Sequence, residues 1–187
     1  MTLAELKTSA RKLTAEEFLE LPLDEADRRE LVNGEIVVSP RPTHAHNFAA
    51  FELARILAAH LDVTKAASLY LDVDNVFDAG NVRAPDIILY PPGAITHPQQ
   101  PAATVPLLCV EVISPSSART DRVEKFKLYE SRGVAHYWIV DPIERTFEAY
   151  SLQDQRYIPS GRGAAEQVLK VPPFAELEIP LARLWHP

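Results

Sequence analysis

Two apolar segments of the chain each carry one acidic residue where an apolar residue would be expected. Asp86 directly precedes the run at residues 87–90, and Glu111 lies in the middle of the run at residues 107–113. A carboxylate inside a buried strand costs free energy unless it is paired or bound to a cation. The two acids therefore predict a site at one end of a buried sheet, and Lys125, on the segment that follows, could complete it.

The length and composition of the chain are typical of a globular protein. Its 187 residues favour a single domain over residues 1–187, and 47% hydrophobic with 24% charged residues is ordinary for such a domain. The net charge of −7 argues against a protein that coats nucleic acid, but a local basic face could still bind it. The chain has no run of 18 apolar residues and no signal peptide, so we expect a cytoplasmic protein with no membrane partner. The single cysteine, Cys109, lies in an apolar run and is expected in the core.

The N-terminal third of the chain carries three local signals. Residues 14–17 form a capping box, which predicts a short helix, and Asn-Gly at 33–34 between two β-prone runs predicts a hairpin. A long helix is expected at about residues 43–61, with a buried stripe formed by Ala45, Ala49, Leu53, Ile56, Leu57 and His60 or Leu61. His44 and His46 lie in its first turn, but side chains two residues apart on a helix diverge by about 200°. A phosphate contact or a helix cap is therefore favoured over a shared metal ion.

The rest of the chain alternates strands with helical segments. Strands are expected at residues 69–77, 83–90, 107–114, 136–140 and 146–152. After the third of these, a helix should begin between Ser117 and Asp121 and end at Gly133. Its inward side chains are expected to be Val123, Phe126 and Tyr129. Asp121 and Lys125 fall on a different stripe, and without the two strand acids this spacing would indicate an ordinary exposed pair. This order predicts an α/β (α+β) fold, a mixed β-sheet flanked by helices, with an N-terminal β-hairpin.

Several short motifs, taken in their order and spacing, resemble one bacterial family. They are ELVNGE at 30–35, SP at 39–40 with His46, PD at 85–86, VEVISPS at 110–116, Asp121, Lys125 and Tyr129, GV at 133–134, and YWIVDP at 137–142. Over a core of about residues 14–152 the chain resembles the "putative restriction endonucleases" of the PD-(D/E)XK nuclease superfamily. The resemblance implies a restriction-endonuclease-like core of helix, three strands, helix and strand, with Mg²⁺ at its active edge.

The resemblance also implies roles for individual residues. Asp86 matches the aspartate of the PD half-motif, and Glu111 matches the acidic position that follows. Ile113 stands where the lysine two residues later would be, so the resemblance implies that Lys125 on the next helix takes its place. Two secondary site candidates match family positions upstream: Glu30 and His46.

The chemistry of these residue types agrees with metal-dependent phosphodiester hydrolysis. Mg²⁺ or Mn²⁺ prefers oxygen ligands, so the carboxylates of Asp86 and Glu111 with the Val112 carbonyl would be enough. The ion would stabilise charge on a phosphate and activate a water that Lys125 orients. We therefore expect a Mg²⁺-dependent endonuclease acting on DNA, and the family resemblance implies 5′-phosphate and 3′-hydroxyl ends. Analogy with enzymes that cut both strands as dimers favours a homodimer.

Two other functions remain open from the sequence. A binding or scaffold protein on the nuclease fold could retain a cation site and cut nothing. A metal-dependent hydrolase of small phosphoesters would need the same acids, and the net charge of −7 fits it better because steering a duplex favours a positive surface. If Asp86 and Glu111 repel one another in the metal-free protein, the substitution Asp86→Asn should raise stability.

Overall fold

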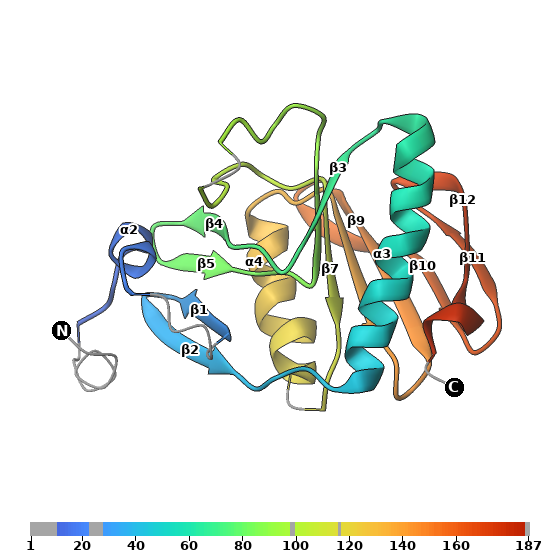
Figure 1. The fold of residues 1–187 in the computed structure, drawn as a ribbon, viewed down its shortest axis with the longest axis horizontal. Helices are drawn as coiled ribbons and strands as arrows, with labels where there is room; N and C mark the ends of the chain where they lie inside the picture. The colour runs from blue at the N-terminus through green and yellow to red at the C-terminus, as the bar shows by residue number, and fades with distance from the viewer. Residues whose placement is uncertain (1–10, 23–27, 98–99, 116, 186–187) are drawn as a thin grey trace. The chain divides into compact units, whose positions relative to one another are not determined.

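The computed structural model describes residues 11–22, 28–97, 100–115 and 117–185, and the chain separates into two compact units. The first unit comprises Met1–Arg41, Val73–Ala84 and His97–Thr104. The second comprises Pro42–Asp72, Pro85–Thr96 and Val105–Pro187. Figure 1 follows the chain through both units. The single domain expected over residues 1–187 stays a prediction.

The first unit is a small antiparallel sheet with one short helix, α2 (Ala15–Leu19). The helix begins with the predicted capping box, in which the Thr14 side chain and the Glu17 side chain each bond the other's backbone N–H. The sheet has the order β2-β1-β5-β4, from β1 (Arg28–Val32), β2 (Glu35–Ser39), β4 (Asn75–Asp78) and β5 (Asn81–Arg83). Asn33 and Gly34 both have positive φ, 51° and 85°, which is the conformation that the predicted two-residue hairpin turn requires.

The second unit contains a six-stranded sheet with the order β10-β9-β8-β7-β6-β3. Its strands are β3 (Ser68–Leu71), β6 (Ile87–Tyr90), β7 (Leu108–Val112), β8 (His136–Asp141), β9 (Thr146–Gln153) and β10 (Arg156–Ala164). The pair β7–β8 is parallel and the other pairs are antiparallel, so the sheet is mixed, as predicted. A two-stranded sheet of β11 (Val168–Val171) and β12 (Phe174–Pro180), followed by the 3₁₀ turn η2 (Leu181–Leu184), belongs to the same unit.

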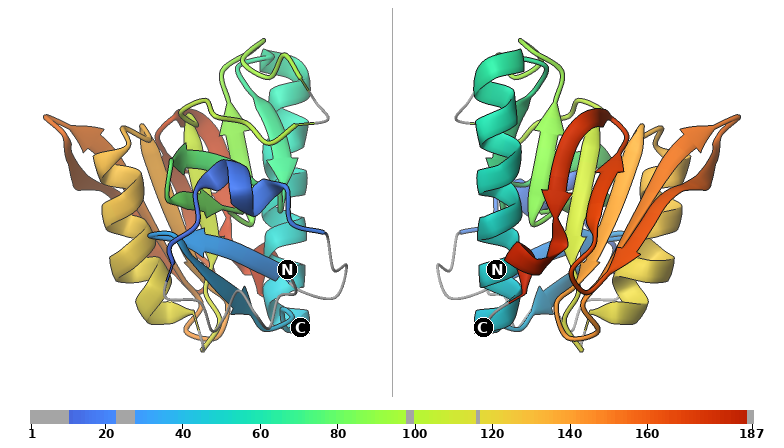
Figure 2. Two further views of the ribbon diagram at one scale, coloured as in Figure 1. Left: turned by 90° about the vertical axis from the view of Figure 1, so that its left-hand side faces the viewer. Right: turned by 90° about the vertical axis from the view of Figure 1, so that its right-hand side faces the viewer.

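Two helical segments cover opposite faces of the six-stranded sheet, as both views in Figure 2 show. They are α3 (His44–Thr64) and the segment formed by η1 (Thr120–Lys125) and α4 (Phe126–Ser131). Along β7, Leu108, Val110 and Val112 belong to the core shared with α3, whereas Cys109 and Glu111 alternate with them. All five are buried, so β7 is the expected central strand and Cys109 is a core residue. Among the described residues, none of the helices combines the length and the apolar character needed to cross a membrane.

Two strands predicted as continuous are each divided in the structure. The segment at 69–77 forms β3 and β4, which belong to different sheets, and Asp72 between them has a left-handed φ of 49°. The segment at 83–90 forms β5 and β6, interrupted at Pro85. Proline has no N–H to donate to a sheet, and an isolated positive φ turns the chain away from a straight strand. Both predictions of a single strand were therefore wrong, and residues 72–74 and 84–86 lie outside the strands.

The helical segment after β7 buries Tyr129 as predicted, but the rest of its buried face differs from the prediction. Val123 is 43% exposed, whereas Asp121, Lys125 and Tyr129 are buried at intervals of four residues. The first part, η1, is a π-helical turn with i→i+5 hydrogen bonds. Because this turn is wider than an α-helical turn, it changes which side chains lie on the same face of the segment. Asp121 and Lys125 are therefore not an exposed pair. The segment ends as predicted at Gly133, which has a φ of 78°.

Candidate functional site

The two strand acids lie at the same end of the six-stranded sheet. Strands β6 and β7 are antiparallel, with Ile87 opposite Val110. Continuing this register by one position places Asp86 opposite Glu111. Asp86 Oδ2 accepts a hydrogen bond from the Val112 backbone N–H at 2.8 Å, which ties the acid to the end of β7. The pairing of the strands thus brings together two acids that are 25 residues apart in the chain (111 − 86 = 25).

Lys125 reaches Glu111 from the helical segment that follows β7. Its Nζ lies 2.8 Å from Glu111 Oε2, and both residues are buried. The hydroxyl of Tyr129 donates to the other carboxylate oxygen, Glu111 Oε1, at 2.7 Å. Lys127, two residues further along the same segment, is exposed. The structure therefore places the ammonium of Lys125 against the strand acid, and sequence reasoning missed Tyr129 as part of this cluster.

Asp121 is a third buried acid in the same cluster. Its Oδ1 lies 3.5 Å from Lys125 Nζ, and only 2% of the residue is exposed. Burial raises the pKa of Asp121 above its ordinary value, while the charge of Lys125 and a hydrogen bond with Ser117 act in the opposite direction. From the sequence, an exposed pair of Asp121 with Lys125 was the alternative to a place for Lys125 in the site, and Asp121 itself was not predicted as a site residue. The four-residue spacing of Asp121, Lys125 and Tyr129 was the signal that could have revealed the shared face.

His46 joins the cluster through its ring and not through the helix terminus. Its Nε2 lies 3.2 Å from Asp86 Oδ2, and both side chains are about nine-tenths buried. The cap of α3 is Thr43, whose side chain accepts the His46 backbone N–H, so His46 is not the cap. His44 is exposed, which agrees with the predicted divergence of the two side chains.

The environment of Asp86 favours its ionised form. Burial alone raises the pKa of a carboxyl group, but here the hydrogen bond and the charge of His46 act against burial. The charge of Lys125 and the Val112 N–H act in the same direction as His46, and together they bring the pKa of Asp86 below its ordinary value. Asp86 is therefore a carboxylate available as a negative ligand at neutral pH.

Glu30 lies in the first unit, where it has a buried cationic partner. Its Oε2 is 3.2 Å from Arg83 Nη1, and its Oε1 accepts the Ala84 backbone N–H at 3.1 Å. These contacts hold the end of β5 against β1. Of the predicted site residues, the second unit thus gathers Asp86, Glu111, Lys125 and His46, and Glu30 pairs within the first unit.

The donor set of the cluster suits a cation that needs few protein ligands. In the described part of the chain, no group of three or more His, Cys, Asp or Glu side chains is arranged to hold a metal ion. Mg²⁺ keeps several waters and commonly uses one or two carboxylates, so Asp86 and Glu111 fit its requirements. Both are oxygen donors near the ammonium of Lys125, and a further acid, Asp121, lies within reach of the same amine. A hard divalent cation would offset this concentration of negative charge.

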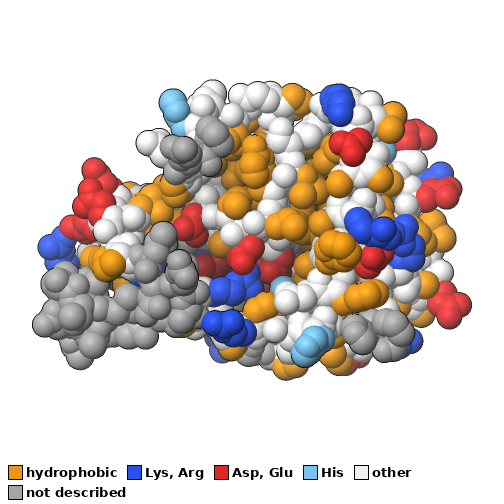
Figure 3. Space-filling view, in the orientation of Figure 1, with side chains coloured by type: hydrophobic (Ala, Val, Ile, Leu, Met, Phe, Trp, Pro, Cys, Tyr) orange, Lys and Arg blue, Asp and Glu red, His pale blue; other side chains and the backbone are white. Residues whose placement is uncertain are grey.

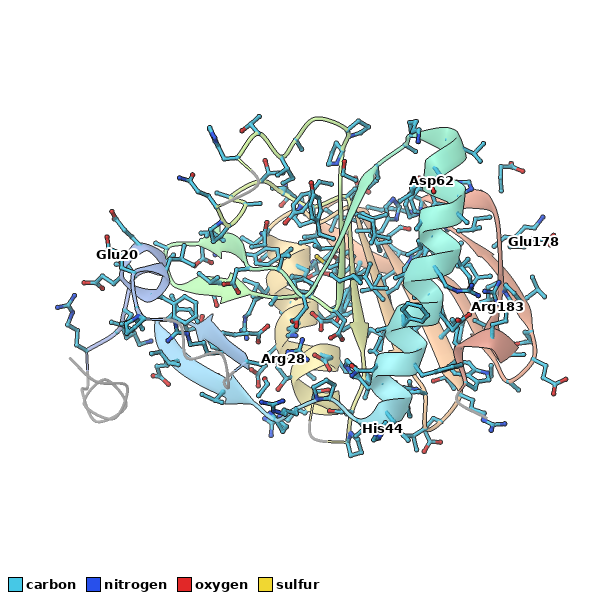
Figure 4. All side chains as sticks on the ribbon, in the orientation of Figure 1. Glu20, Arg28, His44, Asp62, Glu178 and Arg183 are labelled. Atoms are coloured by element: carbon cyan, nitrogen blue, oxygen red, sulfur yellow. The ribbon has the colours of Figure 1, made fainter. Side chains whose placement is uncertain are left out.

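Basic side chains of the second unit are paired with acids in several places. Glu52 on α3 contacts Arg55 and Arg183, and Figure 4 shows Arg183 beside this helix. Arg122 contacts Glu148, and Lys65 lies 3.9 Å from Asp62. Over α3, Figure 3 shows Lys and Arg side chains interleaved with acidic and hydrophobic ones. The charge of this face is therefore mixed.

The comparisons with known proteins agree with this fold. An uncharacterized protein from Synechocystis sp. is 26% identical over 141 residues, which cover 74% of this chain and 80% of the relative. The crystal structure of a "putative nuclease" from Anabaena variabilis matches with a TM-score of 0.75 at 23% identity, covering 92% of this chain and 97% of that one. This likeness confirms the predicted mixed α/β fold of the nuclease type. A family model described as "Putative restriction endonuclease" matches residues 15–182, which is most of the sequence. The chain is therefore a member of the "Putative restriction endonuclease" family.

Proposed function

We propose that the protein is a divalent-metal-dependent endonuclease that hydrolyses phosphodiester bonds in DNA. Membership of the family supports a nuclease function in general. The observation that carries the specific proposal is the buried contact of Lys125 Nζ with Glu111 Oε2 at 2.8 Å. This contact joins an amine on a helical segment to an acid on β7. A second acid, Asp86, lies in the same cluster, and its environment favours the charged form. A buried ammonium beside such acids suits the stabilisation of a phosphate group.

The two strand acids are the proposed ligands of Mg²⁺ or Mn²⁺. Asp86 is held by Val112 and His46, so its carboxylate is oriented before any ion arrives. Glu111 is held by Lys125 and Tyr129, and the Val112 carbonyl is a further candidate ligand. When bound, the cation supplies positive charge to the phosphate and makes a water molecule more acidic. His46 is proposed to position Asp86.

Lys125 is proposed either to orient the attacking water or to stabilise the charge that develops on the phosphate. Its buried ammonium can orient the attacking water or neutralise the charge that develops on the phosphate, and the low local dielectric strengthens either effect. The water oxygen forms a bond to phosphorus while the bond from phosphorus to the 3′ oxygen breaks. The proton of the water passes to solvent and a proton is taken up by the 3′ oxygen. The products are a 5′-phosphate and a 3′-hydroxyl end.

A cleavage assay tests this function directly. Purified protein is incubated with supercoiled plasmid and with single-stranded DNA over a titration of Mg²⁺ and of Mn²⁺. We expect cleavage only with a divalent cation, and a loss of at least about 100-fold in Asp86→Ala and Lys125→Ala. The exposed Lys127→Ala is the matched control and should remain within about twofold of the wild type.

The same assay separates the other two functions. Binding of DNA without cleavage by the wild type would support a binding or scaffold protein on this fold. Hydrolysis of a small phosphodiester without cleavage of either DNA would support a small-phosphoester hydrolase, which the net charge of −7 also favours. Cleavage by Lys125→Ala at the wild-type rate would contradict the assigned role of the lysine. We propose that the protein forms a homodimer to cut both DNA strands. Light scattering tests this by measuring the molar mass of the protein in solution.

A further inference from the structure

Asp121 is held in place by contacts that do not involve the proposed metal ligands. Its backbone N–H donates to the Ser117 carbonyl at 2.9 Å, and its backbone carbonyl accepts the Tyr137 hydroxyl at 2.9 Å. Burying a carboxylate is costly unless a partner compensates. Within the described residues, Lys125 is the cationic side chain within 4 Å of the Asp121 carboxylate. The fold therefore keeps a buried acid at a fixed position next to the proposed catalytic lysine.

Lys125 lies between two carboxylates at unequal distances. Its Nζ is 2.8 Å from Glu111 Oε2 and 3.5 Å from Asp121 Oδ1. The second oxygen of Glu111 is engaged by Tyr129. A divalent cation that takes an oxygen of Glu111 repels the nearby ammonium, because like charges at this separation interact strongly in a buried site. Asp121 is an acid next to Lys125 that is not a proposed ligand of the ion, and without it Lys125 would have to leave the cluster or oppose binding of the ion.

We propose that Asp121 is a positioning residue that holds the Lys125 ammonium beside the site while Glu111 uses an oxygen to bind the divalent cation. The inference rests on the proposed function, because it requires a cation at Glu111. Asp121 and Lys125 are four residues apart on one buried face, so a small rotation of the lysine side chain exchanges one acid for the other. Asp121 thus keeps the amine within reach of the phosphate.

A double-mutant cycle tests whether Asp121 acts through Lys125. The affinity for Mn²⁺ is measured by titration calorimetry in the wild type, Asp121→Asn, Lys125→Met and the double variant, with melting temperatures recorded to establish folding. We expect Asp121→Asn to weaken Mn²⁺ binding at least about fivefold, or about 1 kcal/mol, in the wild-type background. In the Lys125→Met background the same substitution should change the affinity less than about twofold.

The controls and contrary outcomes follow from the same cycle. Glu124→Gln, an exposed acid on the same segment, should leave Mn²⁺ binding unchanged. An equal loss of affinity from Asp121→Asn in both backgrounds would mean that Asp121 acts directly on the ion, and the inference would be wrong. If wild type and Asp86→Ala bind Mn²⁺ equally, the proposed function itself fails, which is a separate result.

A crystal structure of the wild-type protein with Mn²⁺ tests the inference without any variant. We expect Lys125 Nζ to lie closer to Asp121 than the 3.5 Å seen here, and further from Glu111 than 2.8 Å. An ion bound at Glu111 with both lysine distances unchanged would overturn the role assigned to Asp121.

Discussion

At the scale of single residues, the site is a set of buried charges that compensate one another unequally. Asp86 has a lowered pKa because His46, Lys125 and the Val112 N–H together outweigh the cost of burial. Asp121 has a raised pKa because burial outweighs the favourable effect of Lys125. Two acids in one cluster thus differ in the direction of their shifts. The negative charge of Asp86 adds to burial in raising the pKa of Asp121, whereas His46, Lys125 and the Val112 N–H lower the pKa of Asp86, and local sequence reveals neither environment.

The contacts of Asp86 reverse the stability change expected from repulsion alone. Because its folded pKa lies below the unfolded value, ionised Asp86 stabilises the fold above the ordinary aspartate range, about pH 4. That contribution is lost as the pH falls through the folded pKa. We therefore expect Asp86→Asn to destabilise the metal-free protein by about 1–3 kcal/mol at neutral pH, with the difference disappearing in acid.

Urea unfolding of the wild type and of Asp86→Asn, from neutral pH to about pH 3, measures this difference in stability. The difference should begin to shrink as the pH falls below the ordinary aspartate pKa. Asp62→Asn, an exposed acid on α3, serves as the control and should change stability little at any pH. A metal-free Asp86→Asn variant that is as stable as the wild type at neutral pH would contradict this prediction, and a variant that is more stable would restore the repulsion hypothesis.

At the scale of elements, short-range signals set the ends of strands and helices, and backbone geometry sets the faces that they bury. The turn at Asn33-Gly34 follows directly from residue type, because both positions need a left-handed backbone. The π-helical turn of η1 does not follow from residue type, and in it Asp121 and Lys125 are buried while Val123, which was expected to face inward, is exposed. Spacing along the chain therefore predicted the helical segment but not its orientation.

The hairpin turn of the first unit offers a test at this scale. A Cβ at Gly34 would lie 2.7 Å from Lys12 Cβ and 3.1 Å from the Leu13 carbonyl oxygen, on a backbone with φ of +85°. Gly34→Ala should therefore cost about 1–2 kcal/mol for the left-handed conformation, with more from displacing Lys12. Chemical denaturation measures the loss.

Gly93 is the matched control for that variant. It also has a positive φ, 75°, but a Cβ there meets nothing within 4 Å among the described atoms. Gly93→Ala should show only the backbone cost, so it should be less destabilising than Gly34→Ala. Equal losses would mean that contact with Lys12 contributes nothing.

At the scale of the whole molecule, the chain divides into two units, and four of the five residues predicted to contribute a side chain to the site fall in the second. Those four come from α3, the start of β6, β7 and η1, which are separated along the chain by other elements. Occupation of the cluster by a cation would therefore link elements on both faces of the six-stranded sheet. Any ion that binds only the folded state should stabilise this arrangement.

Thermal unfolding should detect that linkage. At a Mg²⁺ or Mn²⁺ concentration about 100 times its dissociation constant, stability should rise by about 2.7 kcal/mol, or about 5–10 °C in melting temperature for a chain of this size. Calorimetric scans with and without a chelator measure the shift. Asp86→Ala should abolish it, and Glu35→Gln, an exposed acid of the first unit, should keep it in full. A full shift in Asp86→Ala would place the ion elsewhere.

Much of the candidate site could be predicted because its residues are chemically conspicuous. Asp86 and Glu111 stand out as acids in apolar strands, and Lys125 follows them on a segment with helical spacing. Their convergence could be expected because adjacent strands bring distant positions together. Tyr129 and Asp121 were missed as members of the cluster because a tyrosine and an acid–lysine spacing are common on ordinary helices.

The sequence by itself determined the element types, the hairpin turn, the mixed sheet and the acids and lysine proposed for the candidate site. Those features depend on residue chemistry and on periods of two or about 3.6 residues, which a linear chain displays. Only the tertiary structure decided that residues 69–77 and 83–90 each divide between two units, and that Asp121 is buried against Lys125. The division of the strands depends on pairing between strands that are distant in the chain, and the burial of Asp121 depends on the width of one helical turn. Local sequence allows more than one backbone conformation in each place, so it does not decide either outcome.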